Sequence, residues 1–105
     1  MNIVIACCVG MSSSMMMESM LQYCKKTNQQ MDIQVLSVDL LCTSDLTPDV
    51  ILLGPQVRMS KKRLSKVFCD TPIGIIPDGV YAHVDGKKAV AFAEKLYAEK
   101  MVGDK

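Results

Sequence analysis

A cysteine stands where the first apolar run of the chain gives way to a glycine and three serines. The segment reads Asn2-Ile-Val-Ile-Ala-Cys-Cys-Val-Gly-Met-Ser-Ser-Ser14, and a helical pattern follows it. This layout predicts the Cys7 thiol at the carboxyl end of a strand, facing backbone N–H groups at a helix N-terminus. Such N–H groups bind oxyanions and favour the thiolate form of a cysteine. The chemistry expected of the segment is to hold a phosphoryl group on sulfur.

The residues after Cys7 have the types of an anion-binding loop. A glycine lets the backbone turn tightly and bring its N–H groups inward. The serine hydroxyls add donors and can also cap the helix that follows. The predicted phosphate-binding loop consists of Cys8, Val9, Gly10, Met11, Ser12, Ser13 and Ser14.

The spacing of this loop resembles the Cys-x5-Arg-Ser loop of low-molecular-weight tyrosine phosphatases. In that loop the arginine clamps the phosphate bidentately and stabilises the transition state. Here Ser13 occupies the arginine position, and Ser14 follows it. Because the cation is missing, we expect attack by water to be slow and a phosphocysteine to survive long enough to be handed on.

The elements that must position the loop alternate between strand and helix patterns. Strand patterns fall at residues 2–6, 32–38, 49–53 and 73–76, the first and third continuous and the second alternating as in an edge strand. Helical patterns fall at residues 12–27, 57–68 and 87–101, with one further turn within 39–48. A turn at 77–79 and a loop at 81–84 precede the last helix, which Asp85 would cap and which should stop before Gly103. The order predicts a single α/β domain over residues 1–105, with a parallel sheet and helices on both faces.

Two strand ends are expected to face one crevice. Ligands of parallel sheets lie outside the carboxyl ends of the strands, where the strand order switches. Cys7 ends the first strand, and Gly54, Pro55 and Gln56 end the third. Asp78 and Tyr81, which follow the fourth strand, are further candidate neighbours, although an Asp–Gly pair is more often simply a turn.

Composition narrows the classes of function. The chain has 105 residues, is 50% apolar and carries a net charge of +1, so it fits one domain with no general attraction to nucleic acid or lipid. Its longest apolar run, residues 3–11, is far short of the roughly 18 residues of a membrane span, and no basic region precedes it as in a signal peptide. Five cysteines without a Cys-x-x-Cys pair argue against a disulfide framework or a zinc site and for a reducing compartment.

Nearly the whole chain resembles the enzyme IIB components of the lactose/cellobiose/chitobiose class of the bacterial phosphotransferase system. Cys7-Cys-Val-Gly-Met-Ser-Ser-Ser14 matches that family's Cys-x-x-Gly-Met-Ser-x-Ser loop. Asp49-Val-Ile-Leu-Leu-Gly-Pro-Gln56 matches its Asp-Val-(apolar)2-Leu-Gly-Pro-Gln segment. A third stretch, Tyr81 to Gly86, resembles its Tyr-Gly-x-x-(Asp/Asn)-Gly region, with Ala82 in place of the first glycine.

The resemblance implies a concrete role. Cys7 would accept a phosphoryl group from a phosphohistidine of enzyme IIA and donate it to a sugar bound by the membrane enzyme IIC. It also implies a four-stranded parallel sheet in the order 2-1-3-4, with no cofactor and no metal. The protein would be cytoplasmic and peripheral to the inner face of the membrane through enzyme IIC, without inserting into the membrane itself.

The residues leave two other functions open. One is a thiol phosphatase or arsenate reductase using the same loop, against which the missing arginine at Ser13 counts. The other is a non-catalytic partner-binding regulator, favoured by the basic residues on the predicted helix 57–68. These residues are Arg58, Lys61, Lys62, Arg63 and Lys66. Such a run is usually a solvated face, and its functional alternative is docking of an acidic partner or of the anionic inner leaflet.

The remaining cysteines and the single histidine have simpler interpretations. Cys8 competes with Cys7, but the strand pleat turns it to the opposite face. Cys24, Cys42 and Cys69 are interpreted as small core residues. His83 is interpreted as a surface residue beside Tyr81.

Overall fold

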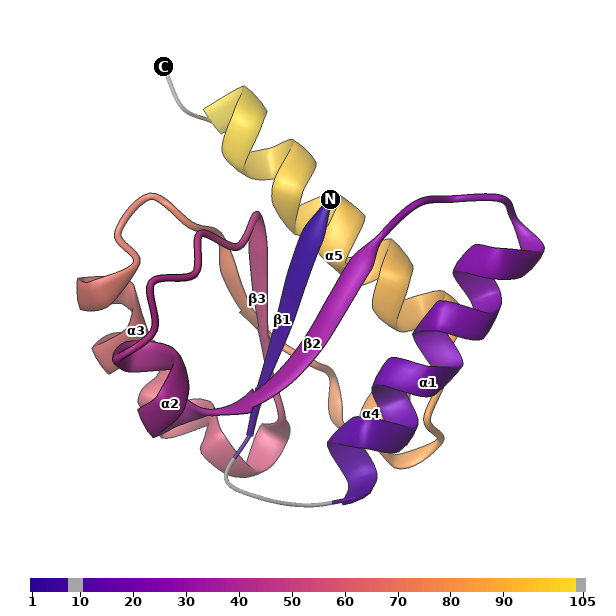
Figure 1. Ribbon diagram of the computed structural model, residues 1–105, viewed down its shortest axis with the longest axis horizontal. Coiled ribbons are helices and arrows are strands. Elements are labelled where there is room, and N and C mark those ends of the chain that lie inside the picture. Colours follow the sequence, from indigo (N-terminus) through magenta and orange to yellow (C-terminus); the bar gives the residue numbers. More distant parts are fainter. Residues whose placement is uncertain (8–10, 104–105) are drawn as a thin grey trace.

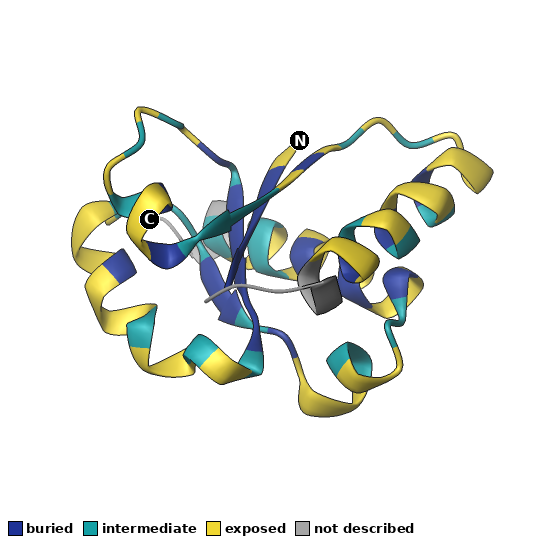
Figure 2. Cartoon of the chain, turned by 60° about the horizontal axis from the view of Figure 1, so that its bottom comes forward, coloured by how far each residue is buried: buried dark blue, intermediate teal, exposed yellow. Residues whose placement is uncertain are grey.

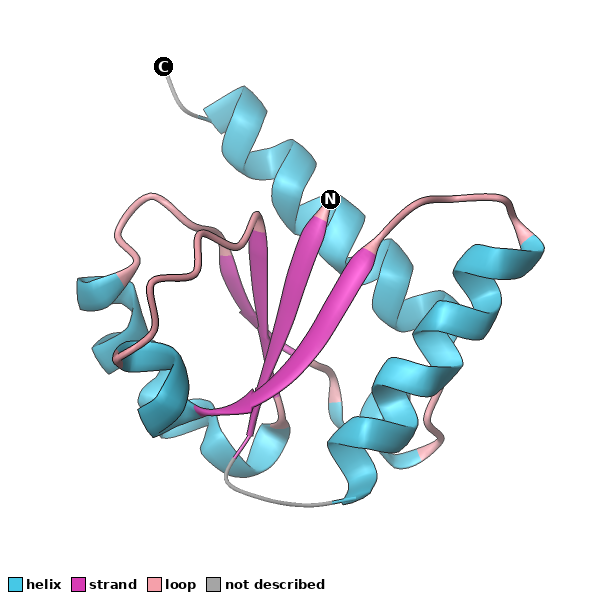
Figure 3. Cartoon of the chain, in the orientation of Figure 1, coloured by secondary structure: helices cyan, strands magenta, loops and turns pink. Residues whose placement is uncertain are grey.

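The chain folds around one sheet with helices on both faces (Figure 1, Figure 3). The structure, a computed structural model, describes residues 1–7 and 11–103, with side chains over residues 1–7 and 14–100. The strands are β1 (Asn2–Cys7), β2 (Asp32–Ser37), β3 (Val50–Leu53) and β4 (Ile73–Ile75). The helices are α1 (Met11–Lys26), α2 (Val38–Cys42), the 3-10 helix η1 (Pro55–Ser60), α3 (Lys61–Val67), α4 (Asp78–Ala82) and α5 (Gly86–Gly103).

The four strands are parallel and lie in the order β2-β1-β3-β4, as predicted. In the register, Cys7 pairs with Ser37 of β2, and Ala6 pairs with Leu53 of β3. Because all strands run the same way, their carboxyl ends meet at one edge of the sheet, which we call the carboxyl edge. This edge lies at the bottom of Figure 1, and the amino ends of the strands lie at the top.

The sheet separates two apolar layers, because successive side chains of a strand point to opposite faces. Ile3 and Ile5 of β1 pack on the side of α1 and α5, and Val4 and Ala6 pack on the side of α2 and α3. The central strand β1 is therefore buried on both faces, as its continuous apolar run predicts. Figure 2 shows the strands buried in the middle and exposed residues on the surrounding helices.

The predicted helix 57–68 is two elements in the structure. The chain first forms η1, in which Pro55 fits the first position because its fixed φ suits a helix start. Val57 then has non-helical angles (φ −116°, ψ 24°), and the α-helical turns of α3 begin only at Lys61. The predicted apolar stripe is partly wrong, since Leu64 is buried but Val67 is exposed.

The predicted turn at 77–79 and loop at 81–84 are also wrong in part, because α4 forms over Asp78–Ala82. Pro77 precedes this helix with extended angles, and its carbonyl accepts the first helical hydrogen bond from Tyr81 N at 3.0 Å. Gly79 is tolerated inside it because the helix has only 5 residues and tertiary packing overrides propensity.

Two helix ends differ slightly from the prediction, and one predicted helix cap is confirmed. The helix α1 begins at Met11, so the serines at positions 12–14 lie in its first turn instead of preceding it as caps. The predicted cap of α5 is confirmed, since Asp85 Oδ1 accepts from Lys88 N at 3.1 Å. The helix α5 continues to Gly103 instead of ending at Met101, a difference within the usual fraying of helix ends.

Candidate functional site

Cys7 lies at the carboxyl edge as the last residue of β1, and 6% of its surface is exposed. By the alternation of the strand, its side chain shares a face with Ile3 and Ile5, the face that α1 covers. The helix α1, which packs on this face through Met16 and Met20, begins at Met11, four residues after Cys7 in the chain. Cys8, Val9 and Gly10 lie outside the described residues.

The rest of the predicted phosphate-binding loop belongs to the first turn of α1. Met11, Ser12, Ser13 and Ser14 are all helical. The side chains of the first three lie outside the described part, and Ser14 is exposed. The backbone of a first helical turn leaves N–H groups without intrahelical partners, which is the arrangement an oxyanion needs.

The end of β3 is held beside the end of β1. Gly54 N donates to Ala6 O at 3.1 Å, which places Gly54 next to the residue that precedes Cys7. A Cβ on Gly54 would lie 3.0 Å from Gln56 Oε1 and 3.6 Å from Tyr81 Oη. The side chains of Gln56 and Tyr81 therefore converge on Gly54, and the missing Cβ leaves room for both.

The predicted crevice neighbours thus fall into two groups. In the first group, Gly54, Gln56 and Tyr81 come together. Pro55, between Gly54 and Gln56 in the chain, is half-buried and begins η1. Asp78 is exposed in the first turn of α4, about one turn before Tyr81 on the same helix. His83 is exposed at the end of α4, where its Nδ1 lies 2.8 Å from Gly79 O.

The sequence did not predict the contact that joins α1 to the start of α5. Ser19 Oγ, in the middle of α1, donates to Val84 O at 2.9 Å and accepts from Gly86 N at 3.1 Å. A Cβ on Gly86 would lie 2.4 Å from the backbone C and O of Ser19, so only glycine permits this approach. The signal in the sequence was a glycine directly after the capping Asp85. The contact positions α1, the helix that follows Cys7 in the chain and covers its face of the sheet.

The basic residues of η1 and α3 are all exposed. Arg63 makes an ion pair with Asp39 of α2, with Nη1 2.8 Å from Oδ1, and this hydrogen bond raises the pKa of the guanidinium above its ordinary value. The pair joins α3 to α2 across the surface. The other four cations of the run extend into solvent from residues 58–66.

The cysteines outside the loop differ in environment. Cys24 is buried as predicted, and burial, followed by the nearby Glu94 carboxylate, raises the pKa of its thiol. Cys42 is half-buried, whereas Cys69 is exposed after α3, so its assignment to the core is wrong. Cys69 lies in the turn between α3 and β4, where no helix or strand covers it.

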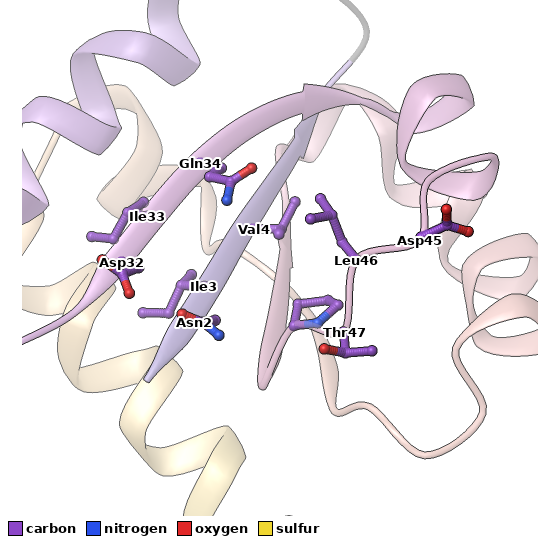
Figure 4. Close-up of a pocket in the computed structure, with 10 residues that line it drawn as sticks. Asn2, Ile3, Val4, Asp32, Ile33, Gln34, Asp45, Leu46 and Thr47 are labelled. Atoms are coloured by element: carbon purple, nitrogen blue, oxygen red, sulfur yellow. The ribbon is translucent and has the colours of Figure 1, made fainter.

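A polar pocket of about 380 Å³ lies at the opposite edge of the sheet, away from Cys7 (Figure 4). It is lined by the first residues of β1 and β2 and by the loop before β3, including Asp32, Asp45 and Thr47. Beside this loop, Asn2 N donates to Asp49 Oδ2 at 2.8 Å. None of the predicted site residues lines this pocket. Over residues 11–103, no helix is both long and apolar enough to cross a membrane.

A four-stranded parallel sheet in the order β2-β1-β3-β4, with a cysteine at the carboxyl end of β1, places the chain in the class of small α/β proteins with a thiol at the carboxyl edge of the sheet. Residues 2–92 match the family model described as the lactose/cellobiose-specific IIB subunit of the PTS system, and the chain belongs to this family. It is a transferase component that carries phosphoryl groups in a sugar phosphotransferase system. This membership favours the carrier over the phosphatase and the regulator considered above.

Named relatives and solved structures agree with this family. The galactose-specific EIIB component of Lactococcus lactis subsp. cremoris (strain MG1363) is 33% identical over 90% of this chain and 94% of the relative. The oligo-beta-mannoside-specific EIIB component of Bacillus subtilis (strain 168) is 29% identical over the same shares. The solution structure of a cellobiose-specific IIB component from Borrelia burgdorferi has a TM-score of 0.78 at 33% identity, covering 95% of this chain and 94% of that one. A lactose-specific IIB domain from Streptococcus pneumoniae, at 17% identity, a TM-score of 0.73 and coverage of 92% and 97%, shares the fold.

Proposed function

We propose that Cys7 is the residue that carries the phosphoryl group, taking it from a phosphohistidine of enzyme IIA and giving it to a sugar bound by enzyme IIC. One observation carries the proposal: Cys7 ends β1 on the face where α1 begins. A phosphoryl group on its sulfur would meet the N–H groups of the first turn of α1, where a negative charge is stabilised.

The two transfers need little covalent chemistry from this subunit. In the first, the thiolate sulfur attacks phosphorus, the S–P bond forms, the N–P bond breaks and imidazole leaves. In the second, a sugar hydroxyl oxygen attacks, the O–P bond forms, the S–P bond breaks and the thiolate returns. The hydroxyl proton passes to a base on the sugar-binding side. Such transfers depend mainly on positioning and electrostatic stabilisation, which the backbone of a helix start supplies.

The proposed location follows from the second transfer. The carrier works in the cytoplasm and reaches the inner face of the membrane by docking on enzyme IIC, which holds the sugar. Relatives named for galactose and for cellobiose match this chain equally well, at 33% identity over 101 residues each. This equality supports selection of the sugar by the membrane component.

Phosphoryl uptake by cysteine variants tests the proposal. The protein is incubated with labelled phosphoenolpyruvate, the general phosphotransferase proteins and an enzyme IIA of the lactose/cellobiose class. We expect stable label on the wild type and background label on Cys7→Ser, with the label located by mass spectrometry in the tryptic peptide that ends at Lys25. Cys69→Ser, at an exposed position, is the matched control and should label normally. Normal uptake by Cys7→Ser, or loss of uptake in Cys8→Ser alone, would overturn the assignment.

A further inference from the structure

We propose that Met15, Leu40 and Met59, which we call the apolar rim, form the docking surface for the phosphohistidine donor protein together with the basic residues beside them. The inference rests on the proposed function, because it concerns the partner that loads Cys7. The occupant is a protein face that is apolar at its centre and negatively charged where its phosphohistidine lies.

The three side chains stand on three different elements around the carboxyl edge. Met15 lies on α1, which follows β1; Leu40 lies on α2, which follows β2; and Met59 lies on η1, which follows β3. Their exposed fractions are 52%, 61% and 86%. In Figure 1, α2 lies to one side of the end of β1 and the first turn of α1 lies to the other, and Figure 2 turns this edge toward the viewer. Because Cys7 ends β1 at the same edge of the sheet, we place the partner that loads it on this edge.

The hydrogen bonding and packing of α2 keep the Leu40 side chain exposed. Ser37 Oγ caps α2 by accepting from Leu40 N at 3.1 Å, and the next residue, Leu41, is fully buried under the helix. The ion pair between Arg63 and Asp39 links α2 to α3 at the surface. Leu40 therefore cannot turn into the core, because Leu41 already fills the inward position. A large apolar side chain fixed outward on a rigid element is typical of an interface, and methionine adapts readily to a partner surface.

The charge beside the rim complements a phosphorylated donor. Residues 55–67 contain five cations and no carboxylate, and Met59 lies among them between Arg58 and Lys61. A phosphohistidine adds negative charge to the donor at the point of contact, so this field attracts the loaded donor more strongly than the discharged one. A membrane surface fits less well, since α3 buries Leu64 and exposes a single large apolar side chain, Val67, which is too little apolar surface to insert.

Four single substitutions test the docking surface. Met59→Asp and Leu40→Asp place a carboxylate on the rim, and Val67→Asp and Leu21→Asp do the same at exposed apolar positions on α3 and α1 away from it. The initial rate of Cys7 phosphorylation is measured against the concentration of phosphorylated enzyme IIA. Urea unfolding of each variant verifies that these exposed substitutions leave the fold intact.

For the two rim variants we expect the half-saturating donor concentration to rise about tenfold or more, as for a central interface residue. The rate at saturation should stay within about twofold, because Cys7 and α1 are unchanged. The two control variants should behave as the wild type. Equal behaviour of rim and control variants would overturn the docking surface while leaving the proposed function intact, whereas absence of label in every protein would overturn the proposed function.

A charge reversal separates the donor from a lipid surface. Lys61→Glu with Lys62→Glu should slow uptake from enzyme IIA at low salt, with the difference shrinking as salt is added. Sedimentation with phosphatidylglycerol vesicles is measured on the same proteins. If the reversal abolishes vesicle binding and leaves uptake from enzyme IIA unchanged, the donor assignment is wrong and the surface contacts lipid.

Discussion

The two faces of the sheet are built differently. One face is covered by the long helices α1 and α5, of 16 and 18 residues, which cross at Ser19 and Gly86. The other is covered by α2, η1 and α3, of 5, 6 and 7 residues. On this second face η1 buries no residue and α3 buries only Leu64.

The difference separates stability from recognition. Long helices bury continuous apolar stripes, so the α1–α5 face stabilises the fold and holds α1 on the face of the sheet to which Cys7 belongs. The short helices bury few residues and leave their neighbours exposed, so the α2–α3 face presents Leu40 and Met59, and only Met15 of the proposed docking surface comes from α1. The chain therefore keeps most of its exposed apolar surface near Cys7 on the face that contributes less to the core.

The largest expected change in the free energy of unfolding comes from truncating one buried side chain on each face of the sheet. Met20→Ala on α1 and Leu64→Ala on α3 should each lower the free energy of unfolding by about 2–5 kcal/mol, because both side chains are fully buried. The two variants should differ in how well the substituted helix is protected from amide exchange. In Met20→Ala, α1 still buries Met16 and Cys24, whereas in Leu64→Ala, α3 has no buried side chain left. Amide hydrogen exchange should therefore accelerate throughout α3 in Leu64→Ala and stay slow in α1 of Met20→Ala.

The matched control for this pair is Leu40→Ala, which truncates an exposed leucine on the same face as Leu64. Its free energy of unfolding should change by no more than about 0.5 kcal/mol. Equal exchange in α1 and α3 after the two core substitutions would show that the short helices are anchored as firmly as the long ones.

A second, somewhat smaller effect is expected at the crossing of α1 and α5. Gly86→Ala should lower the free energy of unfolding by about 1–3 kcal/mol, because the added Cβ meets backbone atoms of Ser19, which cannot rotate away. The same substitution should slow Cys7 phosphorylation, since α1 must shift. Gly79→Ala is the control, as nothing lies within 4 Å of its Cβ, and it should be neutral or slightly stabilising. Urea unfolding and uptake assays on both variants measure these effects.

The sheet was predictable from the sequence because its signals are strong. Continuous apolar runs identify β1 and β3 as central, the alternation over 32–38 identifies the edge strand, and the family resemblance supplies the order that the structure confirms. The position of Cys7 at a strand end was predictable for the same reason, since β-branched residues stop where the glycine and serines begin.

The short elements were harder to predict. The helix α4 contains Gly79 and follows Pro77, residues that ordinarily indicate a turn, and it forms because tertiary packing places Val80 and Tyr81 against the core. The non-helical angles of Val57 interrupt the predicted helix, and the side chain of Val57 has no unusual helix propensity that would indicate them. The contact of Ser19 with Gly86 joins residues 67 positions apart, and no local pattern reports such a distance.

The smallest expected effect concerns the pH dependence of the long-helix face through Cys24. Burial raises the pKa of this thiol in the folded state, so above the pKa of the unfolded thiol, about 8.5, the folded chain binds more protons than the unfolded one. The stabilising contribution is complete below that value and is lost as the pH rises through the folded pKa.

Urea unfolding under reducing conditions should give a lower free energy of unfolding at about pH 10 than at about pH 7. This decrease should be smaller in Cys24→Ala than in the wild type. Cys69→Ala, which changes an exposed thiol, should keep the wild-type decrease. If Cys24→Ala and the wild type lose stability in parallel, the thiol exchanges with solvent in the folded state, and the α1–α5 face is looser than its packing indicates.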